Sequence, residues 1–584
     1  MHLDSKNKTY RISAGLLVLL IILTKSVLLL ISIYSYRPIL IIYSIITIAP
    51  AIFLFAFSFL FNARSKLIYL FILDLIVSLI FITDVVYFRA FDHIISVYMI
   101  FAKGVTEDLG SSILSLIQWR DFLFLIDVPF LYFLFFRSCH FTEEIKEFKV
   151  RFVQSVLMLA LSISIICYQF MNQVEDTSLC NPAVHPITMS PLGAHMFDIY
   201  RFIYERTDNL NTEDLHIIEQ WFAQNKQYHE VDTSYKYLQG IIAGKNLIVV
   251  QLESLENILI GYSVNGQEVT PYLNRLVRNS IYFDNIHEQT RDGNSSDAEL
   301  MFNTSLYPLE RGSAFIRFGD NDYPMALPRL LKENGYTSVA IHGDNKDFWN
   351  RDSTFNSFGF DKYVSEEDFE NKTKVGMGIL DEYLFDQSLK EIKGLHSPYY
   401  LFIITVTSHM PFEAADKVES INVENDDYTG KYLRCINYTD RVLGQFYERL
   451  EKSGHLDNTV IVIYGDHEGV HKYYPTTLPN NEHRIPYLIH IPGMDGMVIS
   501  KVGGQIDMMP TLAYLLGIDE TEYSRMVMGR NLLSNSPGVA ILSDRSIVGN
   551  KEDGSHLAQA QETSDLLIRG NYFASKHSDM LGQN

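Results

Sequence analysis

The sequence predicts a membrane-spanning helical half followed by a large α/β domain. Long apolar runs fill the first 172 residues, whereas from residue 244 onward short strand-like runs alternate with helical patterns. The charge changes at the same place, since residues 1–172 carry 14 basic and 11 acidic residues and the remainder carries 34 and 58. A chain of 584 residues is also too long for one ordinary domain. The strongly acidic second half argues against a nucleic-acid partner, which would require clustered positive charge.

Five apolar runs in the first half are long enough, or nearly so, to cross a bilayer. They lie near 12–34, 38–61, 66–88, 120–136 and 152–171. The fourth is the weakest, because it is short and contains Asp127 and Pro129. The first is too long for a cleavable signal peptide and is followed at once by further runs. We therefore expect a five-helix transmembrane domain over residues 1–172.

The loop charges predict the orientation of these spans. Basic residues cluster before the first span, between the second and third, and between the fourth and fifth, which the positive-inside rule places in the cytoplasm. These residues are Lys6, Lys8, Arg11, Arg64, Lys66, Arg137, Lys146, Lys149 and Arg151. Five spans that start inside leave everything after about residue 172 outside the cell.

Charged residues, among them Lys25, Asp74 and Asp127, fall inside predicted spans. Charges in a bilayer are costly and are usually paired or functional. A structural Lys–Asp pair and snorkelling of the lysine toward the interface are both open interpretations.

The second half divides into a polar connector (173–243), an α/β domain (244–530) and a C-terminal segment (531–584). Alternating strands and helices indicate a largely parallel, buried central sheet. The expected strands are 246–251, 281–285, 337–341, 399–406, 460–464 and 487–491. The expected helices are 214–226, 271–280, one starting at 296, 326–334, 431–452 and 507–517. Ligands of such sheets bind beyond the carboxyl ends of the strands.

The stretch Gly293–Glu299 brings a hydroxyl to the start of a helix. Ser296 followed by Glu299 reads as a capping box, which would leave Ser295 projecting at the N-terminal end. The free N–H groups there favour an anion such as phosphate. A hydroxyl is a weak nucleophile until a base or a metal activates it. Taken alone, the stretch favours an ordinary serine-rich N-cap, because capping boxes are common.

Possible metal ligands follow two of the expected strands. Glu253 comes directly after one strand, and the adjacent Asp466 and His467 come directly after another. Carboxylates and imidazole suit Mn²⁺ or Zn²⁺. With Ser295 they give four ligands at one edge of the sheet, where a metal would lower the pKa of the hydroxyl and neutralise a phosphoryl oxygen.

A second group of polar residues follows two other strands. His342 ends the strand 337–341, Arg351 lies nine residues further on, and His409 follows the strand 399–406. Arginine offers a planar donor fork suited to phosphate, and the histidines can donate hydrogen bonds or protons.

These motifs together resemble the signature of the lipoteichoic acid synthases, membrane-anchored glycerol-phosphate transferases of the alkaline phosphatase and sulfatase superfamily. The resemblance spans essentially the whole chain and includes the five N-terminal spans. The motifs are Gln251–Ser254, Gly293–Glu299, His342–Asp352, Gly465–His467 and Gly504–Thr511.

The resemblance implies a sulfatase-like extracellular domain with a Mn²⁺ site, in which Mg²⁺ or Zn²⁺ are alternatives. The metal ligands would be Glu253, Ser295, Asp466 and His467, with Ser295 as the nucleophile. The residues that would hold the glycerol-phosphate group are His342, Asp344, Trp349, Arg351 and His409.

The implied reaction moves glycerol phosphate from phosphatidylglycerol to a glycolipid or a growing polyglycerolphosphate chain, at the bacterial cell membrane. Ser295 departs from the family, whose best-known members have Thr at this position. Transfer of another head group, such as phosphoethanolamine, is the alternative reaction. A true sulfatase would need a C/S-x-P-x-R motif, whereas residues 295–299 read Ser-Ser-Asp-Ala-Glu. A catalytically inactive scaffold would not require all four metal ligands.

Overall fold

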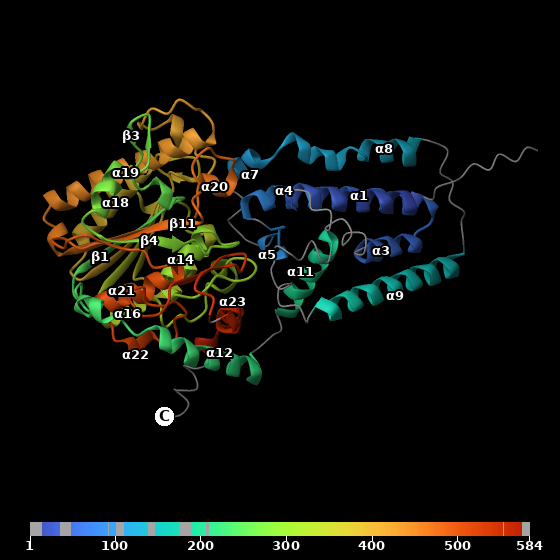
Figure 1. The fold of residues 1–584 in the computed structure, drawn as a ribbon. Helices are drawn as coiled ribbons and strands as arrows, with labels where there is room; N and C mark the ends of the chain where they lie inside the picture. The colour runs from blue at the N-terminus through green and yellow to red at the C-terminus, as the bar shows by residue number, and fades with distance from the viewer. Residues whose placement is uncertain are drawn as a thin grey trace, which may run out of the picture. The chain divides into compact units, whose positions relative to one another are not determined.

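The computed structural model describes residues 14–34, 48–91, 93–100, 110–137, 147–173, 190–205, 210–552 and 554–574 (Figure 1). The chain forms two compact units. The first comprises Met1–Val97 and Leu116–Arg206, and the second comprises Tyr98–Ser115 and Thr207–Asn584. The second unit therefore includes a short segment that lies, in sequence, between helices of the first.

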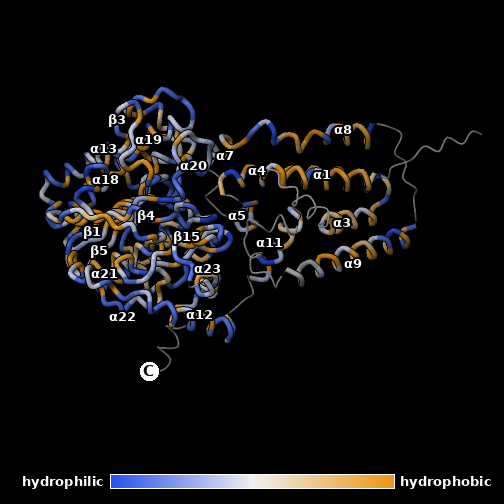
Figure 2. Tube along the Cα trace, viewed as in Figure 1, coloured by the Kyte–Doolittle hydropathy of each residue, from blue (hydrophilic) through white to orange (hydrophobic). Residues whose placement is uncertain are grey.

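Within the described residues, three helices of the first unit are long and apolar enough to cross a membrane. They are α1 (Ala14–Tyr34), α4 (Ala63–Phe91) and α9 (Phe148–Gln173). Figure 2 shows α1 and α4 as mainly hydrophobic along their lengths. They match the first, third and fifth predicted spans, so the described structure supports three spans and not five.

The other two predicted spans are not continuous long helices in the part of the chain that is described. Residues 35–47 of the second lie outside the described residues, and α3 (Ala49–Ala56) with the 3₁₀ turn η1 (Phe57–Leu60) is too short to cross a bilayer. The fourth consists of three short pieces, η2 (Trp119–Leu125), α8 (Val128–Tyr132) and the π-helical η3 (Phe133–Arg137).

The break in the fourth predicted span has a local cause. Asp127 is the N-cap of α8 and Pro129 lies in its first turn. Proline has no N–H to donate and its ring disfavours a preceding helical turn, so a new helix starts there. The first unit also contains α11 (Pro191–Glu205), and α5 (Val97–Ile100) belongs to the second unit except for its first residue.

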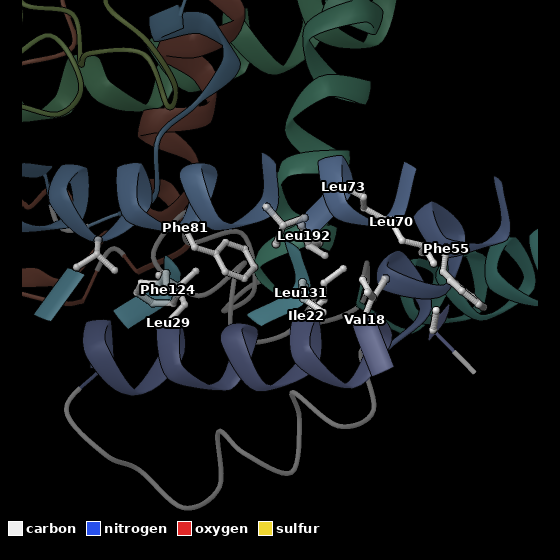
Figure 3. Close-up of a cluster of buried hydrophobic side chains, with 14 of the residues drawn as sticks. Val18, Ile22, Leu29, Phe55, Leu70, Leu73, Phe81, Phe124, Leu131 and Leu192 are labelled. Carbon is white, nitrogen blue, oxygen red and sulfur yellow. The ribbon is translucent and has the colours of Figure 1, made fainter. Parts of the chain in front are cut away.

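The core of the first unit forms mainly between α1 and α4. Figure 3 shows apolar side chains of the two helices gathered in one cluster, which includes Val18, Ile22 and Leu29 of α1 with Leu70 and Phe81 of α4. Apolar residues that recur with the helical period of 3.6 residues lie on one side of a helix, so α1 and α4 can bury these sides against each other.

The buried Lys25 completes the contact between these helices. Its ammonium lies 2.8 Å from an Asp74 oxygen and 2.9 Å from an Asp127 oxygen, and it also donates to Ser78. The intramembrane charges are therefore paired, as one of the two interpretations of the sequence proposed.

The second unit is built on a nine-stranded mixed sheet with the order β12-β4-β11-β10-β1-β9-β5-β6, in which β13 also pairs with β4. Its strands are β1 (Asn246–Leu252), β4 (Ile281–His287), β5 (Thr337–His342), β6 (Lys362–Val364), β9 (Tyr399–Ile404), β10 (Thr459–Gly465), β11 (Arg484–His490), β12 (Met497–Ile499) and β13 (Gly503–Gly504). The strand β11 runs antiparallel to both neighbours, whereas the other pairings are parallel. The prediction of a largely parallel sheet thus misses β11, because burial patterns do not encode strand direction.

Helices surround this sheet, and three two-stranded hairpins lie outside it. The helices are α7 (Gly110–Leu116), α12 (Thr212–Asn225), α13 (Pro271–Val277), α14 (Ser295–Thr304), α15 (Ala314–Phe318), α16 (Leu327–Glu333), α17 (Arg351–Phe358), α18 (Asp381–Gly394), α19 (Tyr428–Lys452), α20 (Val470–Tyr473), α21 (Met508–Leu516), α22 (Glu520–Tyr523) and α23 (Gly554–Arg569). The hairpins are β2 (Ser263–Val264) with β3 (Gln267–Glu268), β7 (Lys374–Val375) with β8 (Gly378–Ile379), and β14 (Val539–Ile541) with β15 (Ile547–Gly549). The sequence did not predict α18 or β6.

The fully buried α14 fixes the position of the candidate nucleophile on the sheet. The Phe302 ring stacks on Tyr464 of β10 with 4.7 Å between centroids, and on Phe402 of β9 at 5.9 Å. Stacking of this kind adds to the burial of the rings. It anchors α14 on the face of the sheet, with Ser295 as its first residue.

Candidate active site

Three predicted metal ligands converge at the carboxyl ends of the adjacent, parallel strands β1 and β10. Ligand atoms of Glu253, Asp466 and His467 all lie within 4.8 Å of one another, and all three residues are buried. The His467 Nε2 is 3.4 Å from a Glu253 oxygen and 3.6 Å from Asp466 Oδ2. Asp466 Oδ2 is buried and has no hydrogen-bond partner. Two buried carboxylates with one oxygen left unpaired form a suitable cradle for a divalent cation.

Backbone and side-chain hydrogen bonds hold these ligands in place. Asp466 Oδ1 accepts from the backbone N–H groups of Ser254 and His467. The Ser254 hydroxyl donates to Glu253 Oε1, and Ser254 has a φ of +57°, which turns the chain directly after the ligand. These contacts leave the other carboxylate oxygens facing the site, as preorganised ligands require.

The imidazole of His467 presents its Nε2 to the site. Its Nδ1–H donates to the Glu468 carbonyl oxygen over 2.7 Å, which fixes the ring and its tautomer. Burial lowers the pKa of His467, but the Asp466 and Glu253 carboxylates outweigh burial and raise the pKa to about 9. Burial and the neighbouring Glu253 carboxylate raise the pKa of Asp466.

Ser295 joins this cluster through its hydroxyl. Its Oγ donates to Glu253 Oε2 over 3.2 Å and lies 3.5 Å from His467 Nε2. As the first residue of α14, Ser295 is followed by backbone N–H groups at the helix N-terminus. The structure therefore brings together all four residues that the sequence proposed as metal ligands.

The predicted capping box is wrong. Asn294 is the N-cap and makes no side-chain cap, the Ser296 hydroxyl donates to the Gly293 carbonyl, and Glu299 is directed to Arg351 instead. The carboxylate of Asp297 replaces the box, because it accepts from the N–H groups of Arg291 and Gly293.

Gly293 is required by this compact loop. A Cβ atom at this position would lie 2.1 Å from Asp297 Oδ1 and 2.8 Å from the Ser296 hydroxyl. Any other residue would push the loop away from the start of α14, which is where Ser295 lies.

Arg351 forms a buried ion pair with Glu299. Its Nε and Nη2 donate to the carboxylate, with the shortest contact at 2.6 Å. Its Nη1 is buried without a hydrogen-bond partner. A fixed guanidinium with one free edge is suited to donate hydrogen bonds to a phosphoryl oxygen.

Two other predicted substrate residues, His342 and Asp344, interact electrostatically with this arginine. His342 is buried, and its Nδ1 contacts the Ile404 carbonyl oxygen at 2.9 Å. Burial and the nearby Arg351 lower the pKa of His342 to about 3, so its imidazole is neutral. The charges of Glu253 and His409 have smaller and opposite effects on the pKa of His342.

Asp344, Trp349 and His409 complete the set. Asp344 is buried and interacts electrostatically with Arg351. Trp349 has a φ of +57° just before α17, and its ring packs edge-to-face on Phe348 with 5.7 Å between centroids. His409 Nδ1 contacts the Met410 carbonyl oxygen at 2.7 Å, which leaves Nε2 as its other polar atom.

Sequence reasoning missed a lysine that ties the metal-ligand loop to the nucleophile loop. Lys472 donates to Glu288 Oε1 and to Asn294 Oδ1, both over 2.8 Å. Glu288 in turn accepts from the backbone N–H of Glu468, next to His467. The signal in the sequence was weak, since a lysine five residues after a ligand pair is ordinary.

The fold and the ligand set define a class, the sulfatase-like proteins of the alkaline phosphatase superfamily. Residues 245–518 match the sequence model of the sulfatase family, and residues 1–212 match the lipoteichoic acid synthase N-terminal domain. The chain belongs to the lipoteichoic acid synthase family.

Individual relatives agree with this assignment. Lipoteichoic acid synthase 1 of Bacillus subtilis (strain 168) is 29% identical in an alignment of 575 positions that covers 91% of this chain and 87% of that protein. The lipoteichoic acid synthase of Staphylococcus aureus (strain NCTC 8325 / PS 47) is 31% identical in an alignment of 500 positions that covers 81% of this chain and 76% of that protein. The crystal structure of the lipoteichoic acid synthase LtaP from Listeria monocytogenes covers 61% of this chain and 98% of that chain, with 28% identity and a TM-score of 0.51.

Proposed function

We propose that the chain is a membrane-anchored phosphoglycerol transferase. It moves glycerol phosphate from phosphatidylglycerol to a glycolipid or to a growing polyglycerolphosphate chain. The observation that carries the proposal is the Ser295 hydroxyl, 3.2 Å from a Glu253 oxygen and 3.5 Å from His467 Nε2 at the start of α14. The names of the similar proteins point to the same product.

The first step is attack of the Ser295 oxygen on the phosphorus of phosphatidylglycerol. A P–O bond to Ser295 forms and the P–O bond to diacylglycerol breaks. The hydroxyl proton of Ser295 passes to the Glu253 carboxylate, to which it is already hydrogen-bonded. Diacylglycerol leaves after its oxygen takes a proton, for which we propose His409 as the donor. Glycerol phosphate stays on Ser295 as a phosphodiester.

The second step reverses the first with a new alcohol. The hydroxyl of the acceptor attacks the phosphorus and loses its proton, the P–O bond to Ser295 breaks, and Ser295 regains a proton. Two easier displacements thus replace one difficult displacement. Arg351 is proposed to hold a phosphoryl oxygen through its unpaired Nη1 in both steps.

Glu253, Asp466, His467 and Ser295 fit a divalent cation, and we propose Mn²⁺, with Mg²⁺ or Zn²⁺ as alternatives. When bound, the ion would lower the pKa of the Ser295 hydroxyl and neutralise charge on the phosphoryl group. The unpaired, buried Asp466 Oδ2 supports this fit.

We place the catalytic domain, residues 244–530, on the outer side of the bacterial cell membrane, where both lipid substrates are accessible. The apolar helices α1, α4 and α9 keep it at the membrane. The connector 173–243 and the C-terminal segment 531–584 flank it in sequence.

The test is a trapping experiment with the full chain in lipid vesicles. Phosphatidylglycerol and phosphatidylethanolamine, each labelled in the head group, are supplied separately without an acceptor. We expect a glycerophosphoryl adduct on the peptide that contains Ser295, detected by mass spectrometry. An adduct with ethanolamine would retain the mechanism and establish the alternative head-group transferase. An adduct on another residue would refute the proposed nucleophile.

A further inference from the structure

The short helix α7 is the feature that the proposed function leaves unexplained. It belongs to the second unit, except for its last residue, although its sequence lies between helices of the first. Two of its large apolar residues are exposed, although one of its serines is buried. Ser112 is buried, whereas Ile113 and Leu114 are 44% and 70% exposed.

The serines of α7 attach it beside the active site. The Ser112 hydroxyl donates to the Met410 carbonyl oxygen over 2.9 Å, and the Ser115 hydroxyl lies 2.7 Å from that of Tyr474. The Met410 carbonyl is also the partner of His409 Nδ1. One carbonyl oxygen therefore joins α7 to the histidine that we propose to face the substrate.

The exposed side chains of Ile113 and Leu114 on α7 are suited to contact with an apolar partner. In the sequence, α7 is followed directly by η2 of the first unit, in which the apolar residues Trp119 and Phe122 are 72% and 57% exposed. Residues 173–584 carry a large excess of negative charge, which repels an anionic lipid surface. An apolar contact is a way to approach such a surface against that repulsion.

We propose that Ile113 and Leu114 enter the outer leaflet of the bilayer and that α7 thereby holds the His409 loop at the lipid surface. The occupant of this surface is the phosphatidylglycerol-containing membrane itself. This inference rests on the proposed function, because it explains how a site on a polar domain reaches a head group that stays in the bilayer.

The lipid contact is tested with the full chain in vesicles by tryptophan quenching. Leu114→Trp should add fluorescence that brominated lipids quench, whereas Val498→Trp should add fluorescence that they do not. Val498 is a matched control, since it is a 60% exposed apolar residue on β12 of the same unit. Equal, weak quenching of both variants would overturn the proposal, whatever the reaction of the enzyme.

Turnover gives a second, independent measurement. Leu114→Asp should raise the apparent KM for phosphatidylglycerol in vesicles about tenfold. This is the effect on a binding equilibrium of losing one leucine side chain that is buried in the bilayer. It should leave turnover of water-soluble dihexanoyl phosphatidylglycerol unchanged, and Val498→Asp should change neither. Equal losses with both donors would show that α7 is only structural. Absence of glycerophosphoryl transfer by the unmutated chain would refute the proposed function and leave the quenching result as the test of α7.

The hydrogen bonds that join α7 to His409 can be tested separately from the lipid contact. Ser112→Ala removes the hydrogen bond to Met410 and should lower kcat for both donors with little change in KM. The control is Ser111→Ala, because Ser111 is exposed and adjacent. A change of KM alone in Ser112→Ala would show that α7 does not position His409.

Discussion

The Arg351 guanidinium and the Glu299 carboxylate form a completely buried ion pair, with Nη2 2.6 Å from Oε1 and Nε 3.1 Å from both oxygens. This pair connects α17 to α14, so the residue proposed to bind phosphate is held by the helix that begins with Ser295. Burial raises the pKa of Glu299, while Arg351 opposes that rise by its charge and hydrogen bonds.

Removing one partner of this pair should be costly. Glu299→Ala leaves the guanidinium buried without its counter-charge, and we expect a loss of about 3–5 kcal/mol in the stability of the second unit. Thermal unfolding of the detergent-solubilised chain measures this loss. Glu391→Ala, which removes the partner of the half-exposed Lys362, should cost no more than about 1 kcal/mol. Similar shifts in the two variants would contradict the importance of burial.

Metal binding should depend on the strand-end ligands. The double variant Asp466→Ala, His467→Ala should lose the bound metal but keep the fold, because both residues follow β10 and lie beyond its core. Metal content by mass spectrometry and circular dichroism check the two expectations. His216→Ala, at an exposed histidine on α12, should retain the metal. Stoichiometric metal in the double variant would place the site elsewhere.

Much of this site could be predicted because its ligands follow strands directly. Glu253 and Asp466 each come after a fully buried apolar run, and parallel neighbours bring such positions together. Glu299 could not be assigned in this way, since its partner Arg351 is 52 residues away and the local pattern favoured a capping box.

The membrane half was less predictable for a similar reason. Apolar composition identified 120–136, but Asp127 and Pro129 divide it into short pieces. The partner of Asp127 is Lys25, on a helix about a hundred residues earlier in the chain. Hydropathy reports the environment of a segment and says nothing of such distant pairs.

Lys472 should act as a positioning residue for Ser295. It holds Asn294, whose φ of +47° and ψ of −116° set the chain before α14. Lys472→Met should lower kcat about tenfold with little effect on KM, since the nucleophile shifts while the phosphate site remains. Lys472→Arg should restore part of kcat, and Lys452→Met, at an exposed lysine, should have no effect. A rise in KM without a fall in kcat would assign Lys472 to substrate binding instead.

His229 should make the second unit sensitive to acid. It is buried, its Nε2 has no hydrogen-bond partner, and burial together with Arg530 lowers its pKa to about 4. Between pH 6.5 and pH 4 the unfolded chain binds a proton that the folded chain does not, so stability falls as pH falls through this window. Each unit of pKa difference between the folded and the unfolded chain corresponds to 1.36 kcal/mol. The fall of the His229 pKa from 6.5 to about 4 therefore gives a loss of about 3 kcal/mol in the free energy of unfolding.

Unfolding of the solubilised chain between pH 4 and pH 8 measures this dependence. His229→Gln should have a shallower decline than the unmutated protein below pH 6.5 and a similar stability above it, apart from a constant offset. An identical slope in both proteins would show that other groups cause the acid sensitivity.

Ser295 provides the most direct test of the catalytic assignment. Ser295→Ala should lower kcat by at least about 10³-fold because the attacking oxygen is lost, while donor lipid still binds through Arg351. Ser295→Thr should keep substantial activity, since the hydroxyl remains and the resemblance to the family allows Thr at this position. Ser296 is the matched control. Its hydroxyl donates to the Gly293 carbonyl and contacts the Ser313 hydroxyl. Ser296→Ala should therefore lower the free energy of unfolding by about 1 kcal/mol and change kcat little. An essential Ser296 beside a dispensable Ser295 would move the nucleophile by one residue.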